Sequence, residues 1–217
     1  MNDFLSDAKD FLPLLLSGVW ITIAITICAL LLSVVLGFAW AMLGTSRFAL
    51  LRGVSTTVIN TVRGIPILVQ LFYIYFVLPQ LGITLNAFMA GVAGLGLAYS
   101  VYQAENFRAG FTSVDRSLIE AAQSLGMPHA MIVRRVILPL AIRVILPPLG
   151  NTSIMLLKDS SIASTITVAE LTRQGQLLAV STFKNMTVYS LVALLYLAMS
   201  LPLSYLTRRL ERRFAAR

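Results

Sequence analysis

The chain has 217 residues, of which 58% are hydrophobic and only 12% are charged, and its mean hydropathy is +0.84. An ordinary soluble domain is roughly 45–50% apolar and about 25% charged, so this composition excludes a soluble globular protein and a disordered chain. The formal net charge of +8 lies on a chain that is too apolar for a nucleic-acid binder. We therefore interpret the excess of basic residues as a signal of membrane topology.

Five segments are long and apolar enough to cross a bilayer, which takes about 20 residues of helix. They predict an all-α integral membrane protein with five transmembrane helices, in which residues 1-217 form a single transmembrane domain. The second segment is interrupted by Arg63, Gly64 and Pro66, which predicts a broken helix. The third carries glycine and alanine at small-xxx-small spacing and is predicted to be the central span. The five expected spans lie at about 18-43, 56-79, 86-105, 136-157 and 186-206.

The basic residues predict which side of the membrane each loop faces. Lys and Arg are enriched in cytoplasmic loops, so the more basic loops are placed in the cytoplasm. This rule puts the N-terminus outside and the C-terminus inside. The residues on the expected cytoplasmic side are Arg47, Arg52, Arg108, Arg116, Arg134, Arg135, Arg208, Arg209, Arg212, Arg213 and Arg217, against Lys9, Arg173 and Lys184 on the other side.

The motifs of enzymes and metal proteins are missing from the sequence. It has no phosphate-binding loop, no catalytic-triad motif and no metalloprotease motif. One histidine and one cysteine cannot form a usual His/Cys metal site. The sequence thus predicts a protein that is not an enzyme, with no cofactor or metal held by this chain.

The segment at about 108-135 is the only sizeable cytoplasmic loop among the expected spans. Ser117 followed by Glu120 is the pattern of a capping box at a helix start. Gly126 is expected to end that helix, and Pro128 to begin a second one. Two short helices below the membrane indicate a docking site for a partner protein; an amphipathic loop lying on the bilayer is the alternative.

This loop resembles the EAA loop of ABC-importer permease subunits. Glu120, Ala121 and Ala122 are followed after three residues by Gly126, and after nine more by a Val-Ile-Leu-Pro stretch that starts at Val136, where the family usually has Ile. The resemblance implies the type I ABC importer permease fold. It also implies that the loop is the coupling helix that docks on a cytoplasmic ATPase subunit.

Other segments are similar to the polar amino acid branch of that family, which includes histidine, glutamine, arginine, glutamate and cystine permeases. These segments begin at Arg63, Tyr102, Leu146 and Leu156, in the order found in the family. The resemblance implies a permease subunit that imports a polar amino acid across the bacterial inner membrane. It implies as partners two ATPase subunits that hold ATP and Mg, a second like or related permease subunit, and an extracytoplasmic amino-acid-binding protein, with no nucleic acid.

Ionisable residues within the expected spans are candidates for substrate contact, because charges in a membrane are costly. Lys158 could meet the carboxylate of an amino acid and Asp159 its ammonium, and the family also implies Ser160 and the Arg-Gly-x-Pro break. The alternative is that Lys158 and Asp159 only mark a helix end, and that Arg63 is a structural partner of Glu105. The full candidate set is Arg63, Gly64, Pro66, Glu105, Lys158, Asp159 and Ser160.

Two other functions remain open from the residues alone. The chain could be an ATP-independent channel or secondary carrier, or it could be a membrane anchor for a cytoplasmic complex.

Overall fold

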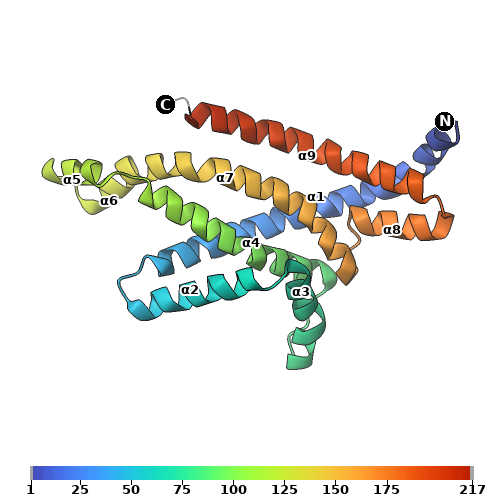
Figure 1. The fold of residues 1–217 in the computed structure, drawn as a ribbon, viewed down its shortest axis with the longest axis horizontal. Helices are drawn as coiled ribbons and strands as arrows, with labels where there is room; N and C mark the ends of the chain where they lie inside the picture. The colour runs from blue at the N-terminus through green and yellow to red at the C-terminus, as the bar shows by residue number, and fades with distance from the viewer. Residues whose placement is uncertain (1, 216–217) are drawn as a thin grey trace.

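The computed structural model describes residues 2–215, and every regular element in that range is a helix. Figure 1 shows an elongated bundle, with the N-terminus and α8 at one end and α5 and α6 at the other. The α-helices are α1 (Asn2–Gly44), α2 (Ala49–Gly64), α3 (Ile67–Phe72), α4 (Ala87–Thr112), α5 (Arg116–Ser124), α6 (His129–Ile132), α7 (Leu138–Asp159), α8 (Leu171–Thr182) and α9 (Asn185–Ala215). Short π or 3-10 turns are η1 (Tyr73–Val77), η2 (Leu78–Leu81), η3 (Val133–Ile137) and η4 (Ser160–Ile166).

Three of the described helices are long and apolar enough to cross a membrane, namely α1, α4 and α9. A fourth span is possible if α2 is counted together with the Ile67–Leu81 segment, although the two are bent by 103°. The expected break is therefore confirmed, and it is sharper than a kink. The helix starts at Ala49, earlier than the expected limit of 56.

The expected fourth span falls in α7, whose 22 residues lie between α4 and α9. It has the length of a span but is not among the three long apolar helices, so the count of five stays a prediction. Pro147 and Pro148 lie inside α7, which runs without interruption from Leu138 to Asp159. The π turn η3 joins it directly to α6.

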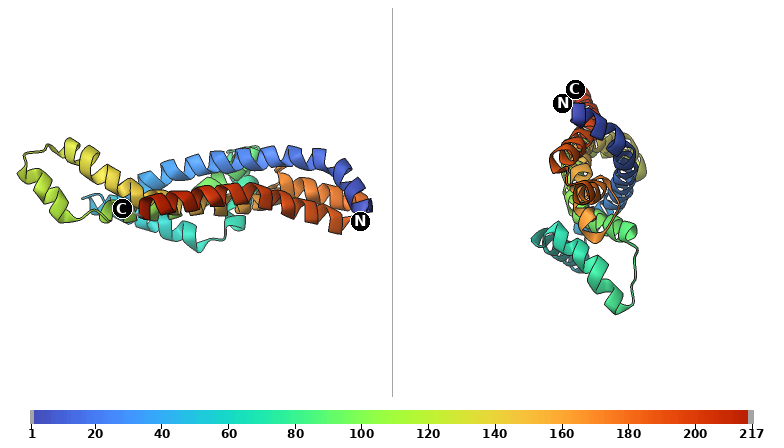
Figure 2. Two further views of the ribbon diagram at one scale, coloured as in Figure 1. Left: turned by 90° about the horizontal axis from the view of Figure 1, so that it is seen from above. Right: turned by 90° about the vertical axis from the view of Figure 1, so that its right-hand side faces the viewer.

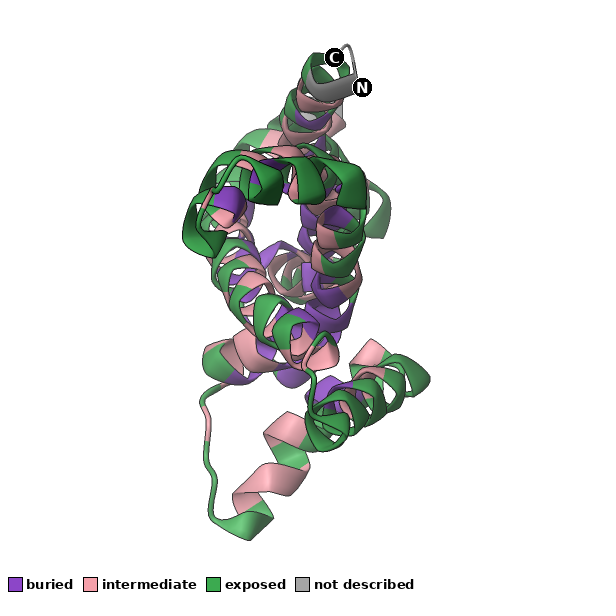
Figure 3. Cartoon of the chain, turned by 90° about the vertical axis from the view of Figure 1, so that its left-hand side faces the viewer, coloured by how far each residue is buried: buried purple, intermediate pink, exposed green. Residues whose placement is uncertain are grey.

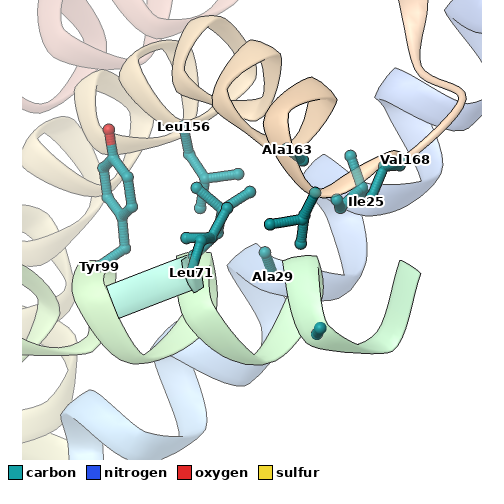
Figure 4. Packing of buried hydrophobic residues seen from close by; sticks show 10 residues of the cluster. Ile25, Ala29, Leu71, Tyr99, Leu156, Ala163 and Val168 are labelled. Atoms are coloured by element: carbon teal, nitrogen blue, oxygen red, sulfur yellow. The ribbon is translucent and has the colours of Figure 1, made fainter. Parts of the chain in front are cut away.

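The centre of the bundle is α4, as the small residues predicted. In its most apolar stretch 61% of residues are buried, against 28% in α1 and 22% in α9. A methyl group on Gly96 would lie 2.7 Å from the side chain of Leu32, so only glycine lets α1 approach this closely. Figure 3 shows that the buried residues line the inside of the bundle, and Figure 4 shows core residues from α1, α3, α4 and α7 meeting there.

At one end of the bundle, α5 and α6 form a helical hairpin that projects beyond the other helices (Figure 2). The expectation of two short helices here is confirmed. Helix α4 continues to Thr112, so the first residues of the expected loop at about 108-135 are helical. The same extension places Glu105 within α4 instead of at its end.

Candidate functional site

Three charged side chains from α2 and α4 form one cluster. An Arg63 Nη atom lies 3.2 Å from Glu105 Oε1, and Arg108 forms an ion pair with the other carboxylate oxygen. Arg63 and Glu105 are therefore partners in the structure, as the structural alternative expected, but the pairing does not by itself assign them a role. Their side chains are 39% and 33% exposed, so the pair remains reachable from outside the bundle.

A row of side chains on α4 connects this cluster to α7. Tyr99, Tyr102 and Glu105 follow one another at intervals of three residues, so each is a neighbour of the next on the helix surface. The Arg63 guanidinium carbon is 5.9 Å from the centroid of the Tyr102 ring, and that ring is 5.8 Å from the Tyr99 ring. We call the five residues Arg63, Glu105, Tyr102, Tyr99 and Asp159 the α4 contact row.

The far end of the row is a hydrogen bond between α4 and α7. The Tyr99 hydroxyl donates to Asp159 Oδ2 at 2.6 Å. Figure 4 shows the Tyr99 ring rising from α4 with its oxygen towards α7. The sequence did not single out Tyr99, because nothing local indicates a partner 60 residues away.

Lys158 and Ser160, the chain neighbours of Asp159, lie in different surroundings. The α-helix ends at Asp159 and continues as the 3-10 turn η4. Lys158 is exposed and takes part in none of the ion pairs of the described residues. Ser160 is buried, and its hydroxyl donates to the Leu157 carbonyl at 2.8 Å. The structure thus joins Asp159 to the row but does not bring Lys158 or Ser160 into it.

The break between α2 and α3 is held by a glutamine. Gly64 ends α2, Pro66 precedes α3, and Ile65 between them is extended. The Gln70 side-chain amide donates to the carbonyls of Val62 and Ile65, both at 2.8 Å. Gln70 satisfies carbonyls that the break would leave without partners. In the sequence, a glutamine within an apolar run was the signal that could have identified Gln70 as a structural residue.

The α5–α6 hairpin is built by caps at both ends of α5. Asp115, not Ser117, is the N-cap, since its carboxylate accepts the Ser117 backbone N–H at 2.9 Å; the expected capping box is therefore wrong. This hydrogen bond lowers the pKa of Asp115 from its usual value. At the other end Gly126 has φ +73°, and the Gly126 and Met127 N–H groups bond back to Gln123 and Ala122, which is a Schellman ending.

The residues expected for coupling differ in exposure. Glu120, Ala121 and Gly126 are exposed, whereas Ala122 is buried in the hairpin, as is Ile132. Glu120 belongs to none of the ion pairs of residues 2–215, so its carboxylate is available to another molecule. Large apolar side chains are exposed beside it, most of all Leu125 at 82%. On a segment that projects from the bundle, such exposure marks an interaction surface.

The fold and these features define a class of protein: a helical membrane protein with a partly exposed charged cluster between α2 and α4 and a projecting helical hairpin at one end. Residues 33–216 match the family model described as "Binding-protein-dependent transport system inner membrane component". The chain belongs to this family.

Similar proteins include two from Bacillus subtilis (strain 168). The chain is 37% identical over 209 residues to the probable glutamine ABC transporter permease protein GlnM, covering 94% of this chain and 97% of the relative. It is 36% identical over 206 residues to the L-cystine transport system permease protein TcyB, covering 94% and 88%. A chain from the crystal structure of an amino acid ABC transporter with histidines matches with a TM-score of 0.89 and 42% identity, covering 97% of this chain and 98% of that one.

Proposed function

We propose that the chain is the permease subunit of an ATP-driven, binding-protein-dependent importer of a polar amino acid. The observation that carries the proposal is the α4 contact row, a line of charged and aromatic side chains across helices of the family's fold. The named relatives are permeases for glutamine and cystine, and the similar structure contains histidines. A polar amino acid is the class that these three share.

The paired charges of the row suit a zwitterion. An amino acid carries one carboxylate and one ammonium, and Arg63 and Glu105 offer the two opposite charges 3.2 Å apart. The substrate can replace each side chain's partner, so that neither charge is left unpaired while it passes. The α2–α3 break at Gly64 and Pro66 lies beside Arg63 and supplies irregular backbone, which in membranes occurs where it lines a cavity or is buried in protein.

At the far end of the row, Asp159 receives the ammonium and Lys158 the carboxylate. Tyr99 holds the Asp159 carboxylate in place, and Lys158 is exposed and without an ion-pair partner among residues 2–215. Ser160 fixes the local turn through its bond to the Leu157 carbonyl. Substrate contact at Lys158 requires a second surface facing it, which a second permease subunit provides.

The hairpin is the proposed contact with the ATPase. Glu120 and the exposed Ala121 face the partner, while buried Ala122 and the Gly126 turn keep the hairpin rigid enough to transmit a movement. Two ATPase subunits hold ATP and Mg, and this chain hydrolyses nothing. An extracytoplasmic binding protein delivers the amino acid at the opposite end of the bundle.

The rest of the arrangement follows from this role. The chain is one permease domain with five spans in the bacterial inner membrane, in which α7 is the fourth span. The N-terminus lies outside, and the hairpin and the C-terminal arginines lie in the cytoplasm. Basic residues cluster at the hairpin end, where a hollow of about 440 Å³ is lined by Pro128, Ala130, Met131, Arg134 and Arg135.

The test is uptake of radiolabelled glutamine, histidine and cystine into proteoliposomes that hold the complex with its ATPase and binding protein. We expect uptake of at least one amino acid that requires ATP inside and stops when the ATPase is omitted. Uptake that is unchanged without the ATPase would establish a channel or a secondary carrier instead.

Variants of the row test the substrate path in the same assay. Asp159→Asn and Arg63→Gln should reduce uptake about tenfold or more, since each removes one charge that the zwitterion needs. Asp10→Asn is the matched control, because Asp10 is exposed on α1 and outside the row. Normal uptake by Asp159→Asn and Arg63→Gln, with ATP hydrolysis intact, would place the substrate path elsewhere.

A further inference from the structure

An apolar groove of about 380 Å³ lies between α1, α7 and α9, away from the α4 contact row. It is lined by Ile23, Thr26, Ile27, Leu157, Met199, Pro202, Leu203 and Leu206. Figures 1 and 2 place α9 on the opposite side of the bundle from α2, which carries Arg63, and from α3. The groove thus lies away from the Arg63 end of the proposed substrate path, and on α7 it is lined by Leu157 rather than by Lys158 or Asp159.

The α9 face that lines this groove continues into two arginines. At 3.6 residues per turn, Met199, Leu203 and Leu206 share one face of the helix, and the next turns bring Arg209 to the edge of that face and Arg213 onto it. Arg213 is seven residues after Leu206, a rise of about 10 Å along the helix. Both arginines are exposed. Arg208 and Arg212 are exposed too, but they lie on the other side of α9.

We propose that the groove binds one acyl chain of an anionic phospholipid whose phosphate is held by Arg209 and Arg213. The apolar lining matches a hydrocarbon chain, and the two guanidinium groups match a phosphate at the end of that chain. The lipid belongs to the leaflet at the arginine end of α9, which is the cytoplasmic leaflet in the proposed orientation.

A second copy of this chain is the competing occupant, and the charges argue against it. Two copies related by a two-fold axis along the membrane normal would face each other at equal depth through this groove. The arginines of one α9 would then oppose the same arginines of the other, and like charges in contact are unfavourable. An anionic headgroup instead attracts the arginines, because its charge is opposite to theirs.

The head-group part of the proposal can be tested by native mass spectrometry of the purified complex. The probes are phosphatidylglycerol and phosphatidylcholine with identical chains. We expect tighter binding of phosphatidylglycerol, and a loss of about 25-fold in Arg209→Gln/Arg213→Gln, roughly fivefold for each arginine. Arg208→Gln/Arg212→Gln is the matched control and should change binding less than twofold. Equal losses in the two double variants would mean general attraction to a basic helix end and overturn the site.

The chain part is tested by filling the groove. Leu206→Trp narrows the groove while both arginines stay, and should weaken phosphatidylglycerol binding. Leu201→Trp is the control, because Leu201 is similarly exposed, at 57% against 53%, but on the other face of α9. Unchanged binding by Leu206→Trp would remove the groove from the site. Oxidative cross-linking of Leu206→Cys between two copies, in a Cys28→Ser background, would show a protein interface and contradict the proposal.

Discussion

Helices α8 and α5 both begin at an acidic side chain that caps their backbone N–H groups, but the two caps have opposite surroundings. Glu170 at the start of α8 is fully buried, whereas Asp115 at the start of α5 is exposed. Burial raises the pKa of the Glu170 carboxyl, while the hydrogen bond from the Ser117 backbone lowers the pKa of Asp115. The same kind of N-cap is therefore buried in the bundle at the start of α8 and exposed to solvent at the start of α5.

The buried cap fixes α8 to its neighbours. Glu170 accepts the Thr172 and Arg173 N–H groups at 2.9 and 2.7 Å and the Tyr196 hydroxyl of α9 at 2.8 Å. Thr22 of α1 accepts the Leu171 N–H at 3.0 Å. Three helices are therefore joined through one carboxylate and two hydroxyls, and α8 is part of the packed bundle.

The exposed cap stabilises only its own helix. The α5–α6 hairpin rests on Asp115, on the Gly126 turn and on a small interior that contains Ala122 and Ile132. Its remaining apolar side chains, such as Leu125, stay uncovered. The difference teaches that α8 is held within the packed bundle, whereas the hairpin leaves apolar side chains exposed, as the proposed contact with an ATPase subunit requires.

The largest expected effect comes from removing the buried cap. Glu170→Ala leaves two backbone N–H groups and the Tyr196 hydroxyl without their acceptor, and should lower the free energy of unfolding by about 3 kcal/mol. Glu170→Gln keeps an acceptor and loses the buried charge, so its effect should be much smaller. Thermal unfolding of the detergent-purified protein measures both. Equal stability of wild type and Glu170→Ala would mean that α8 is not held by this network.

A smaller loss is expected when only the link to α9 is cut. Tyr196→Phe removes one hydrogen bond to a buried carboxylate and should cost about 1.5 kcal/mol in the same unfolding measurement. Tyr205→Phe on the same helix is the control, since Tyr205 is 69% exposed. If the two variants unfold alike, the Tyr196 bond contributes nothing measurable.

In the hairpin, a mutation should affect transport more than stability. Gly126→Ala places a side chain at φ +73°, which costs about 1 kcal/mol locally and disturbs the turn. Gly53→Ala is a matched control, because neither added methyl group meets an atom within 4 Å and only Gly126 has a positive φ. We expect strongly reduced uptake for Gly126→Ala alone, with an unfolding temperature lowered by no more than about 4 °C. A drop in unfolding temperature without loss of uptake would mean that the hairpin contributes to stability rather than to transport.

The smallest expected effect is the pH dependence of the exposed N-cap at Asp115. Because the pKa of Asp115 is lowered in the folded protein, its contribution is present above the ordinary value of 3.8 and is lost as pH falls through the lowered pKa. Hydrogen exchange at the α5 amides should therefore speed up relative to other helices below about pH 3.8 in wild type. Asp115→Asn should show no such pH step, since asparagine caps without titrating. A step that persists in Asp115→Asn would assign it to another group.

The sequence alone predicts most of the architecture, for reasons that are local. Long apolar runs predicted α1, α4 and α9, the Gly-x-Pro pattern predicted the break after α2, and Gly126 predicted the end of α5. Each of these signals depends on residues next to one another in the chain.

The features that were missed depend on distant contacts. Helix α8 is too polar to be recognised as a span, and it is held by Glu170 and Tyr196, which are 26 residues apart. Arg63 and Glu105 were both expected in the site, but the Tyr99–Asp159 bond that extends the row crosses 60 residues. The capping box failed because Asp115, two residues before Ser117, is an equally good cap, and the sequence pattern does not rank the two.

The most direct test of the account is cross-linking to the ATPase subunit in the assembled complex. Leu125→Cys in the hairpin and Val180→Cys in α8, each in a Cys28→Ser background, place thiols at exposed positions at the two ends, since Leu125 is 82% and Val180 73% exposed. The account predicts that a short thiol-to-amine reagent links Leu125→Cys to the ATPase and leaves Val180→Cys unlinked. Linking of Val180→Cys but not of Leu125→Cys would contradict it.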